Sequence, residues 1–168
     1  MKIKKQIEFN NIISDILKNQ EIIDLRYEFH HGISRLDHSL NVAKLTFNIC
    51  KTFNIDTIKE TTRAALLHDF YRSFEDSSFT HHPLVAVKNA KRVFNINKMQ
   101  EDIIACHMFP ATLKLPKYKE NNIQEMTVKE AWINYFKGEN IKESMQVSDK
   151  IEKIDRLLNK YWYEETME

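Results

Sequence analysis

The sequence predicts an all-α protein, a compact helical bundle that forms a single domain over residues 1–168. Apolar residues recur every three or four positions along most of the chain, which is the spacing of one face of an α-helix. Only two glycines and three prolines occur, whereas a sheet-rich fold uses these residues in its many tight turns. A chain of 168 residues is also about the size of one domain with a single sizeable core.

The apolar spacing predicts three helices in the first third of the chain. They cover residues 3–17, 21–29 and 37–53. Gly32 interrupts the pattern between the second helix and the third, in a loop over residues 30–35. In the third helix the apolar positions step by four, three, four and three residues. This stripe is typical of a helix that packs against a core.

A fourth helix is predicted to begin at Asp56 and Thr57 and to run to Phe70. Thr57 and Glu60 have the spacing of a capping box, in which each side chain bonds the backbone N–H of the other residue. We therefore expect these two side chains to define the start of the helix.

Two further helices are predicted after a polar loop. Pro83 suits the first position of a helix over residues 84–94, and Asn97 is placed to cap a helix over residues 98–107. Prolines and lysines interrupt the periodicity over residues 108–126. We expect a loop there, long enough to serve as a lid or a partner surface.

The C-terminal part is predicted to hold two helices. Thr127 and Glu130 repeat the capping-box spacing and open a helix that Gly138 ends. The last helix covers about 141–161. Aromatic residues in and beside these helices fit either the core or a dimer contact, which leaves homodimerisation open: Trp132, Tyr135, Phe136, Tyr161 and Trp162.

Composition and charge exclude several classes of partner. A net charge of +1 gives no basic excess to neutralise the phosphates of a nucleic acid polymer. No apolar run approaches the roughly 18 residues that span a bilayer, and the N-terminus lacks the apolar core of a signal peptide. Cys50 and Cys106 form no spaced framework. We expect a cytoplasmic protein with no membrane contact.

The most informative motif is His68-Asp69, which follows the apolar run Ala64-Ala65-Leu66-Leu67. Imidazole nitrogen and carboxylate oxygen are both ligands for divalent transition metals, so a metal ion explains why the two residues stand together. The chain offers more such ligands at well-separated points, each on or beside a predicted helix: His38, His82, His107 and Asp149. The sequence therefore predicts a site for two metal ions.

In this order, the six residues resemble the signature of the HD superfamily of metal-dependent phosphohydrolases. The matching segments lie within residues 32–151: Arg35–Ala43, Leu66–Asp69, His82–Val87, Ile104–His107 and Val147–Lys150. The resemblance implies an HD-type helical bundle in which different helices supply the ligands. The extra histidines His82 and His107 resemble those of the dinuclear branches.

The resemblance also implies a role for each ligand. His38, His68, Asp69 and Asp149 would hold one metal ion, and His82 and His107 the second, with Asp69 bridging. Two cations about 3.5–4 Å apart can clamp a phosphoryl oxygen and lower the pKa of a bridging water. Without cysteine in the set, a closed structural zinc site is not expected. Iron or manganese is the first expectation, with zinc, nickel, cobalt or magnesium as alternatives.

The residues after His68-Asp69 differ from those of known branches of the HD superfamily. The chain reads Phe70-Tyr71-Arg72, where one branch has Ile-Gly and the dinucleoside-polyphosphate branch has Ile-Ala-Lys. Arg72 could replace that lysine in binding phosphate. No Gly-Tyr-Pro motif follows, which disfavours the hydrolysis of cyclic dinucleotides.

Candidate substrate-binding residues flank the ligands. Arg35 and Arg72 are predicted to bind phosphate, because a guanidinium matches phosphate oxygens bidentately; together with His68 and Asp69 they form the predicted catalytic set. A pair of solvated arginines is the alternative. His31 could reach the mouth of the site and protonate a leaving group, or be an exposed loop residue.

Two neighbouring pairs leave a choice open. Lys150 follows Asp149 and would neutralise charge near the site, unless it lies on an exposed helix face. His81 competes with His82 as a ligand. We prefer His82 because the residue before Pro83 fits the family pattern better.

The predicted function is a metal-dependent phosphohydrolase that acts on a small phosphorylated substrate, a nucleotide or a dinucleoside polyphosphate. Two alternatives stand beside it. One is a di-iron oxygenase, since some dinuclear HD proteins resemble oxygenases. The other is a non-catalytic regulatory module that binds a nucleotide without turning it over.

Overall fold

The computed structural model describes residues 2–30, 32–75, 78, 80–108, 112, 114–121, 123–124 and 127. These residues belong to a compact unit within Met1–Ala131. The predictions for Gly138, for a helix over residues 141–161 and for the C-terminal aromatic residues lie outside the described residues. The single domain over residues 1–168 stays a prediction.

The predicted all-α fold is confirmed. The α-helices are α1 (Lys2–Ile13), α2 (Gln20–Ile23), α3 (Arg35–Thr52), α4 (Ile58–Leu67), α5 (His82–Val93) and α6 (Lys98–Cys106). The shorter elements are the 3₁₀ turns η1 (Ile16–Lys18) and η2 (Asp24–Tyr27) and the two-residue strands β1 (Phe29–His30) and β2 (Ile33–Ser34). Within the described residues, no helix is long and apolar enough to cross a membrane.

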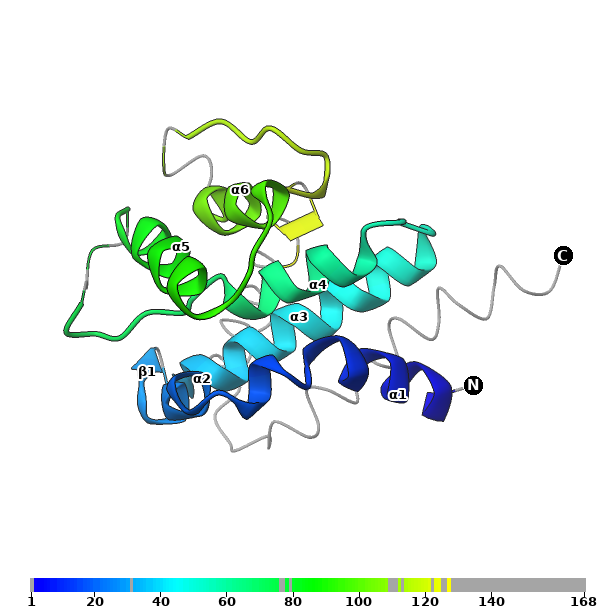
Figure 1. Cartoon of the computed structure of the whole chain (residues 1–168), viewed down its shortest axis with the longest axis horizontal. Coiled ribbons are helices and arrows are strands. Elements are labelled where there is room, and N and C mark those ends of the chain that lie inside the picture. The colour runs from blue at the N-terminus through cyan, green and yellow to red at the C-terminus, as the bar shows by residue number, and fades with distance from the viewer. Residues whose placement is uncertain are drawn as a thin grey trace, which may run out of the picture. The chain divides into compact units, whose positions relative to one another are not determined.

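The core lies around α4. This helix packs against α3 along its length and also contacts α1 and α6, while α5 packs on α6 (Figure 1). The largest side chains at the centre are almost completely buried: Phe47, Leu66, Leu67, Ile103 and Ile104. Because α4 is enclosed on several sides, the residues that follow its last turn enter the interior of the bundle.

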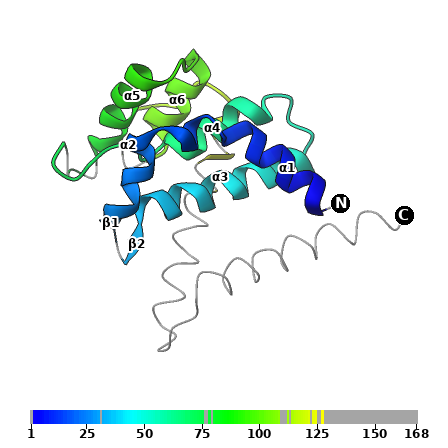
Figure 2. The same cartoon turned by 60° about the horizontal axis from the view of Figure 1, so that its bottom comes forward.

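The N-terminal region differs from the prediction of two uninterrupted helices. The first helix ends at Ile13, and the side chain of Asn19 caps a new helix by accepting from the N–H groups of Glu21 and Ile22. The predicted second helix gives way to a small hairpin at Phe29, which pairs with Ser34 (Figure 2). The local side-chain cap and the hairpin outweigh the apolar periodicity here.

The hairpin sets the start of α3. Gly32 takes a positive φ of 84° in its turn, a conformation that glycine adopts without a steric penalty. Ser34 then caps the helix, with its Oγ 3.1 Å from the N–H of Asp37. The helix therefore begins at Arg35, two residues before the predicted start, and His38 lies in its first turn as predicted.

One predicted helix cap is confirmed and another is wrong. Asn97 caps α6, and with Gln100 it forms a full capping box. The capping box expected at Thr57 is wrong: its side chain makes no cap bond and its hydroxyl donates instead to the carboxylate of Glu120 (2.8 Å). The second predicted capping box needs Glu130, which lies outside the described residues.

The long loop after α6 is fastened to that helix. The carboxylate of Asp102 accepts from the N–H of Lys117 (2.8 Å), and its carbonyl oxygen accepts from the side chain of Asn121 (3.3 Å). Asp102 is only 6% exposed, so both bonds form at the edge of the core. The described part of the loop is thus attached to α6 at Asp102.

Candidate metal centre

Helix ends place the histidines of the site. His38 lies in the first turn of α3 and His82 is the first residue of α5. His68 and His107 follow the last residues of α4 and α6. All four histidine residues are at most 8% exposed. The bundle therefore brings four histidines from four helices into its interior.

Asp69 lies at the centre of these histidines. Its Oδ2 is 3.4 Å from Nε2 of His68 and 3.8 Å from Nε2 of His38. Its Oδ1 is 3.5 Å from Nε2 of His82 and 3.6 Å from Nε2 of His107. Each carboxylate oxygen thus faces one pair of histidines. Asp69 belongs to two groups of candidate ligand atoms, one with His38 and His68 and one with His82 and His107. Within each group the atoms lie within 4.8 Å of one another.

Backbone carbonyl groups orient three of the rings. In His68, the Nδ1 atom lies 2.8 Å from the carbonyl oxygen of Ala65. In His107, the Nδ1 atom lies 2.7 Å from the carbonyl oxygen of Ile104. These carbonyls belong to the last turns of α4 and α6, where helices leave carbonyl groups without an intrahelical partner. In His82, Nδ1 lies 3.2 Å from the carbonyl oxygen of Ser78.

The carbonyl contacts fix the tautomer of these rings. A carbonyl oxygen only accepts hydrogen bonds, so each Nδ1 carries the proton and each Nε2 presents a lone pair toward Asp69. An N–H donated to a backbone carbonyl is the usual partner of a metal-binding histidine. Such outer partners are therefore present for three of the candidate ligands, His68, His82 and His107.

Burial and the charge of Asp69 control the protonation of the site. Burial favours the neutral acid of Asp69, but the neighbouring histidines, His68 foremost, hold the pKa of its carboxyl well below the usual range. Burial, followed by the charge of His68, lowers the pKa of His107 to about 3. Burial also lowers the pKa of His82. These two rings are therefore neutral at pH 7, the form that binds metal.

The pKa of His68 shifts in the opposite direction, upward. Burial opposes its protonation, but the adjacent charge of Asp69 raises its pKa. Its Nε2 is buried and makes no hydrogen bond with the described residues. A lone pair in this position needs a cation, either a proton or a metal ion, because a carboxylate oxygen lies beside it. The nitrogen and oxygen donors suit a divalent transition metal.

A protein-family model described as HD domain matches residues 35–157. The chain belongs to the HD domain family. Comparisons with curated proteins and with solved structures found no match. The HD domain places the chain in a superfamily of metal-dependent phosphohydrolases, and the described histidines and Asp69 form a cluster that could hold a metal ion. Asp149, the sixth predicted ligand, lies outside the described residues.

The structure separates His82 from its rival. His82 is 7% exposed and its Nε2 faces Asp69. His81 is exposed and belongs to neither group of candidate ligand atoms among the described residues. His31 and Lys150, which were predicted to bind substrate, lie outside the described residues.

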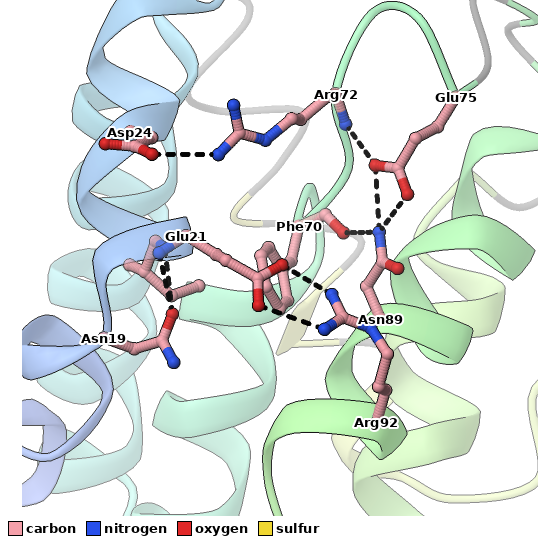
Figure 3. A network of polar contacts seen from close by, with 9 residues as sticks. Asn19, Glu21, Asp24, Phe70, Arg72, Glu75, Asn89 and Arg92 are labelled. Carbon is pink, nitrogen blue, oxygen red and sulfur yellow. Dashed lines mark hydrogen bonds and ion pairs between the residues drawn. The ribbon is translucent and has the colours of Figure 1, made fainter.

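The two predicted phosphate-binding arginines are both engaged with the protein. Arg35 is 4% exposed, and its Nη1 donates to the carbonyl oxygen of Tyr71 (2.6 Å). Arg72 is partly exposed, and its Nη2 lies 3.0 Å from the carboxylate of Asp24 (Figure 3). Arg72 can turn toward solvent from this position, whereas Arg35 is enclosed.

Two residues near the site were not predicted from the sequence. The ring of Tyr71 stacks on His82 with centroids 4.9 Å apart. Asn89, in α5, donates to the carbonyl oxygen of Phe70 (3.1 Å) and to the carboxylate of Glu75 (Figure 3). The sequence alone did not single out Asn89, whose burial only the structure shows. For Tyr71 the only sequence signal was its place two residues after Asp69.

Proposed function

We propose that the protein is a metal-dependent phosphohydrolase with two divalent ions at the site. Its proposed substrate is a small phosphorylated molecule, a nucleotide or a dinucleoside polyphosphate. The observation that carries the proposal is the position of Asp69, whose two oxygens each face a pair of histidines. A carboxylate placed in this way is suited to bridge two ions. The proposed ligands are His38, His68, Asp69, His82, His107 and Asp149.

The divalent ions, when bound, would supply an activated water and neutralise charge on the phosphoryl group. The chain provides the conditions for this chemistry. Buried, neutral histidines bind cations without adding negative charge, so the site remains attractive to an anionic substrate. The two carboxylates among the proposed ligands, Asp69 and Asp149, cancel only part of the positive charge of two divalent ions, so positive charge remains for the substrate.

Arg72 is the described residue best placed to orient a phosphate group. It follows Asp69 by three positions and is partly exposed, in an ion pair with Asp24 that solvent reaches. An exposed ion pair of this kind contributes little stability, so a substrate phosphate can compete for the guanidinium. We therefore propose Arg72, and no longer Arg35, as a phosphate-binding residue.

The proposal is tested by measuring phosphate release from a panel of phosphate esters and nucleotides. Purified protein is assayed with Mn²⁺ or Fe²⁺, with and without oxygen. We expect turnover that needs the metal and does not need oxygen, and that Asp69→Asn abolishes without loss of helical circular dichroism. Turnover that requires oxygen would identify an oxygenase. Nucleotide binding without any product would identify a regulatory module, and either result would overturn the proposal.

A further inference from the structure

The segment after Asp69 has no regular secondary structure, and side chains from two helices hold its backbone. Asn89 of α5 donates to the carbonyl oxygen of Phe70 at 3.1 Å. Arg35 of α3 donates to that of Tyr71 at 2.6 Å. Both residues are at most 5% exposed. Buried carbonyl groups need such partners, and here the partners also fix the chain where it leaves the site.

Tyr71 connects this segment to a candidate ligand. Its ring stacks on the ring of His82, with centroids 4.9 Å apart and an interplanar angle of 29°. The guanidinium carbon of Arg35 lies 3.8 Å from the centroid of the same tyrosine ring. Arg35 therefore contacts Tyr71 in two ways: it donates to the backbone carbonyl oxygen of Tyr71 and its guanidinium lies over the tyrosine ring. Tyr71 is 7% exposed, so the arrangement is enclosed.

His82 needs this support more than His68 and His107 do. His68 and His107 follow helices whose last carbonyl groups accept from their Nδ1 atoms at 2.8 and 2.7 Å. His82 begins its helix, so no preceding helical turn supplies a carbonyl group. Its partner is Ser78, which lies in no helix or strand, and the contact is longer, at 3.2 Å. A stacked ring adds a second restraint on the imidazole plane.

We propose that Tyr71, held in place by Arg35, is the positioning residue for His82. The inference rests on the proposed function, because it concerns the ion bound by Asp69, His82 and His107. Loss of the tyrosine ring frees the His82 ring to rotate and weakens the binding of this ion. The ion at His38, His68 and Asp69 keeps its ligands. The proposal assigns this role to the aromatic ring of Tyr71.

The first experiment compares metal binding by three variants. Tyr71→Phe keeps the ring, Tyr71→Leu removes it, and Phe47→Leu removes a buried ring that packs on Phe9, away from the site. Chelator-stripped proteins are equilibrated with graded Mn²⁺ and their metal content is measured. The electron paramagnetic resonance spectrum reports whether two Mn²⁺ ions are coupled.

Tyr71→Phe and Phe47→Leu are expected to bind two ions per chain, as the wild type does. Tyr71→Leu is expected to keep one ion and to bind the second about 10- to 100-fold more weakly, the usual effect of losing an outer partner of a ligand. Its spectrum should lose the coupled signal at limiting Mn²⁺. Two ions bound with wild-type affinity by Tyr71→Leu would overturn this inference alone. A wild-type protein that binds no metal would overturn the proposed function as well.

A second experiment separates positioning from direct phosphate binding by Arg35. Arg35→Lys keeps the positive charge, but an ammonium group cannot donate to the carbonyl group and lie flat on the ring together. If Arg35 positions Tyr71, this variant binds the second ion more weakly, and saturating Mn²⁺ restores turnover with an unchanged KM. A raised KM together with unchanged metal affinity would assign Arg35 to the substrate and overturn the inference.

Discussion

The Nε2 atoms of His82 and His107 lie 3.0 Å apart, while the Nδ1 atom of each ring faces a backbone carbonyl oxygen. If both rings are neutral, both Nε2 atoms present lone pairs, because the protons reside on Nδ1. Two lone pairs at this distance repel each other unless a cation lies beside both. The fold therefore holds the two nitrogens in an arrangement that a metal ion relieves.

Metal binding should for this reason stabilise the folded protein. Chelator-stripped protein is expected to melt at a lower temperature, and Mn²⁺ at about 100 times its dissociation constant should raise the midpoint by roughly 5–10 °C. Differential scanning calorimetry measures the change. The variant Asp69→Asn should show almost no increase. A wild-type midpoint that does not respond to any of the candidate metals would contradict this prediction.

Replacement of the two adjacent histidines should have unequal effects. His82→Ala removes a ring that faces Asp69 and should reduce the metal content by one ion and turnover by about 100-fold or more. His81→Ala changes an exposed side chain and should alter neither quantity, which makes it the matched control. Elemental analysis and phosphate release measure both variants. Equal losses in the two variants would show that the ligand assignment is wrong.

The ion pair between Arg72 and Asp24 should regulate substrate affinity. Arg72→Ala is expected to raise KM for a phosphorylated substrate about tenfold, since it removes a charged hydrogen bond to phosphate. Asp24→Asn leaves the arginine with a weaker partner (Figure 3) and should lower KM. Steady-state kinetics at saturating metal measure both effects. If neither substitution changes KM, Arg72 has no role in substrate binding.

The ion pair of Asp15 with Arg63 should make stability depend on pH. Its Oδ1 and Oδ2 lie 2.5 and 2.7 Å from the guanidinium, and these bonds lower the pKa of Asp15. A lowered folded-state pKa stabilises the fold above the unfolded value of about 3.9, and the contribution disappears as pH falls through the folded value.

Asp15→Asn should accordingly reduce the free energy of unfolding at pH 7. The side chain of Asp15 is 60% exposed, so solvent screening limits the effect to about 0.5–1 kcal/mol. Urea denaturation at pH 7 and at pH values below 4 measures the difference between variant and wild type. The difference should shrink in acid. A difference that grows as the pH is lowered would contradict the assignment.

Much of the site was predictable because helix ends are local features. The apolar run before His68-Asp69 predicts a buried helix, and its last carbonyl groups are available to orient the ring that follows. The same reasoning applies to His107. The preference for His82 over His81 came instead from the family pattern, which the residue before Pro83 fits better. Periodicity and caps act over a few residues, so the sequence displays them directly.

Contacts between distant segments were not predictable in this way. Arg35 was predicted to bind phosphate, yet it lies against Tyr71, 36 residues further along the chain. Thr57 was predicted to cap its own helix, yet it donates to Glu120, 63 residues away. In both cases the side chain has two chemically reasonable partners, and tertiary packing decides between them.

The most direct test of the central claim is the number of metal ions that each chain binds. Chelator-stripped wild-type protein and the Asp69→Asn variant are equilibrated with Mn²⁺, freed of unbound metal and analysed for manganese and protein. We predict about two ions per wild-type chain and a large loss in the variant, because Asp69 faces all four histidines. A wild-type chain that binds none of the candidate metals, or a variant that binds two ions as tightly as the wild type, would contradict a dinuclear site centred on Asp69.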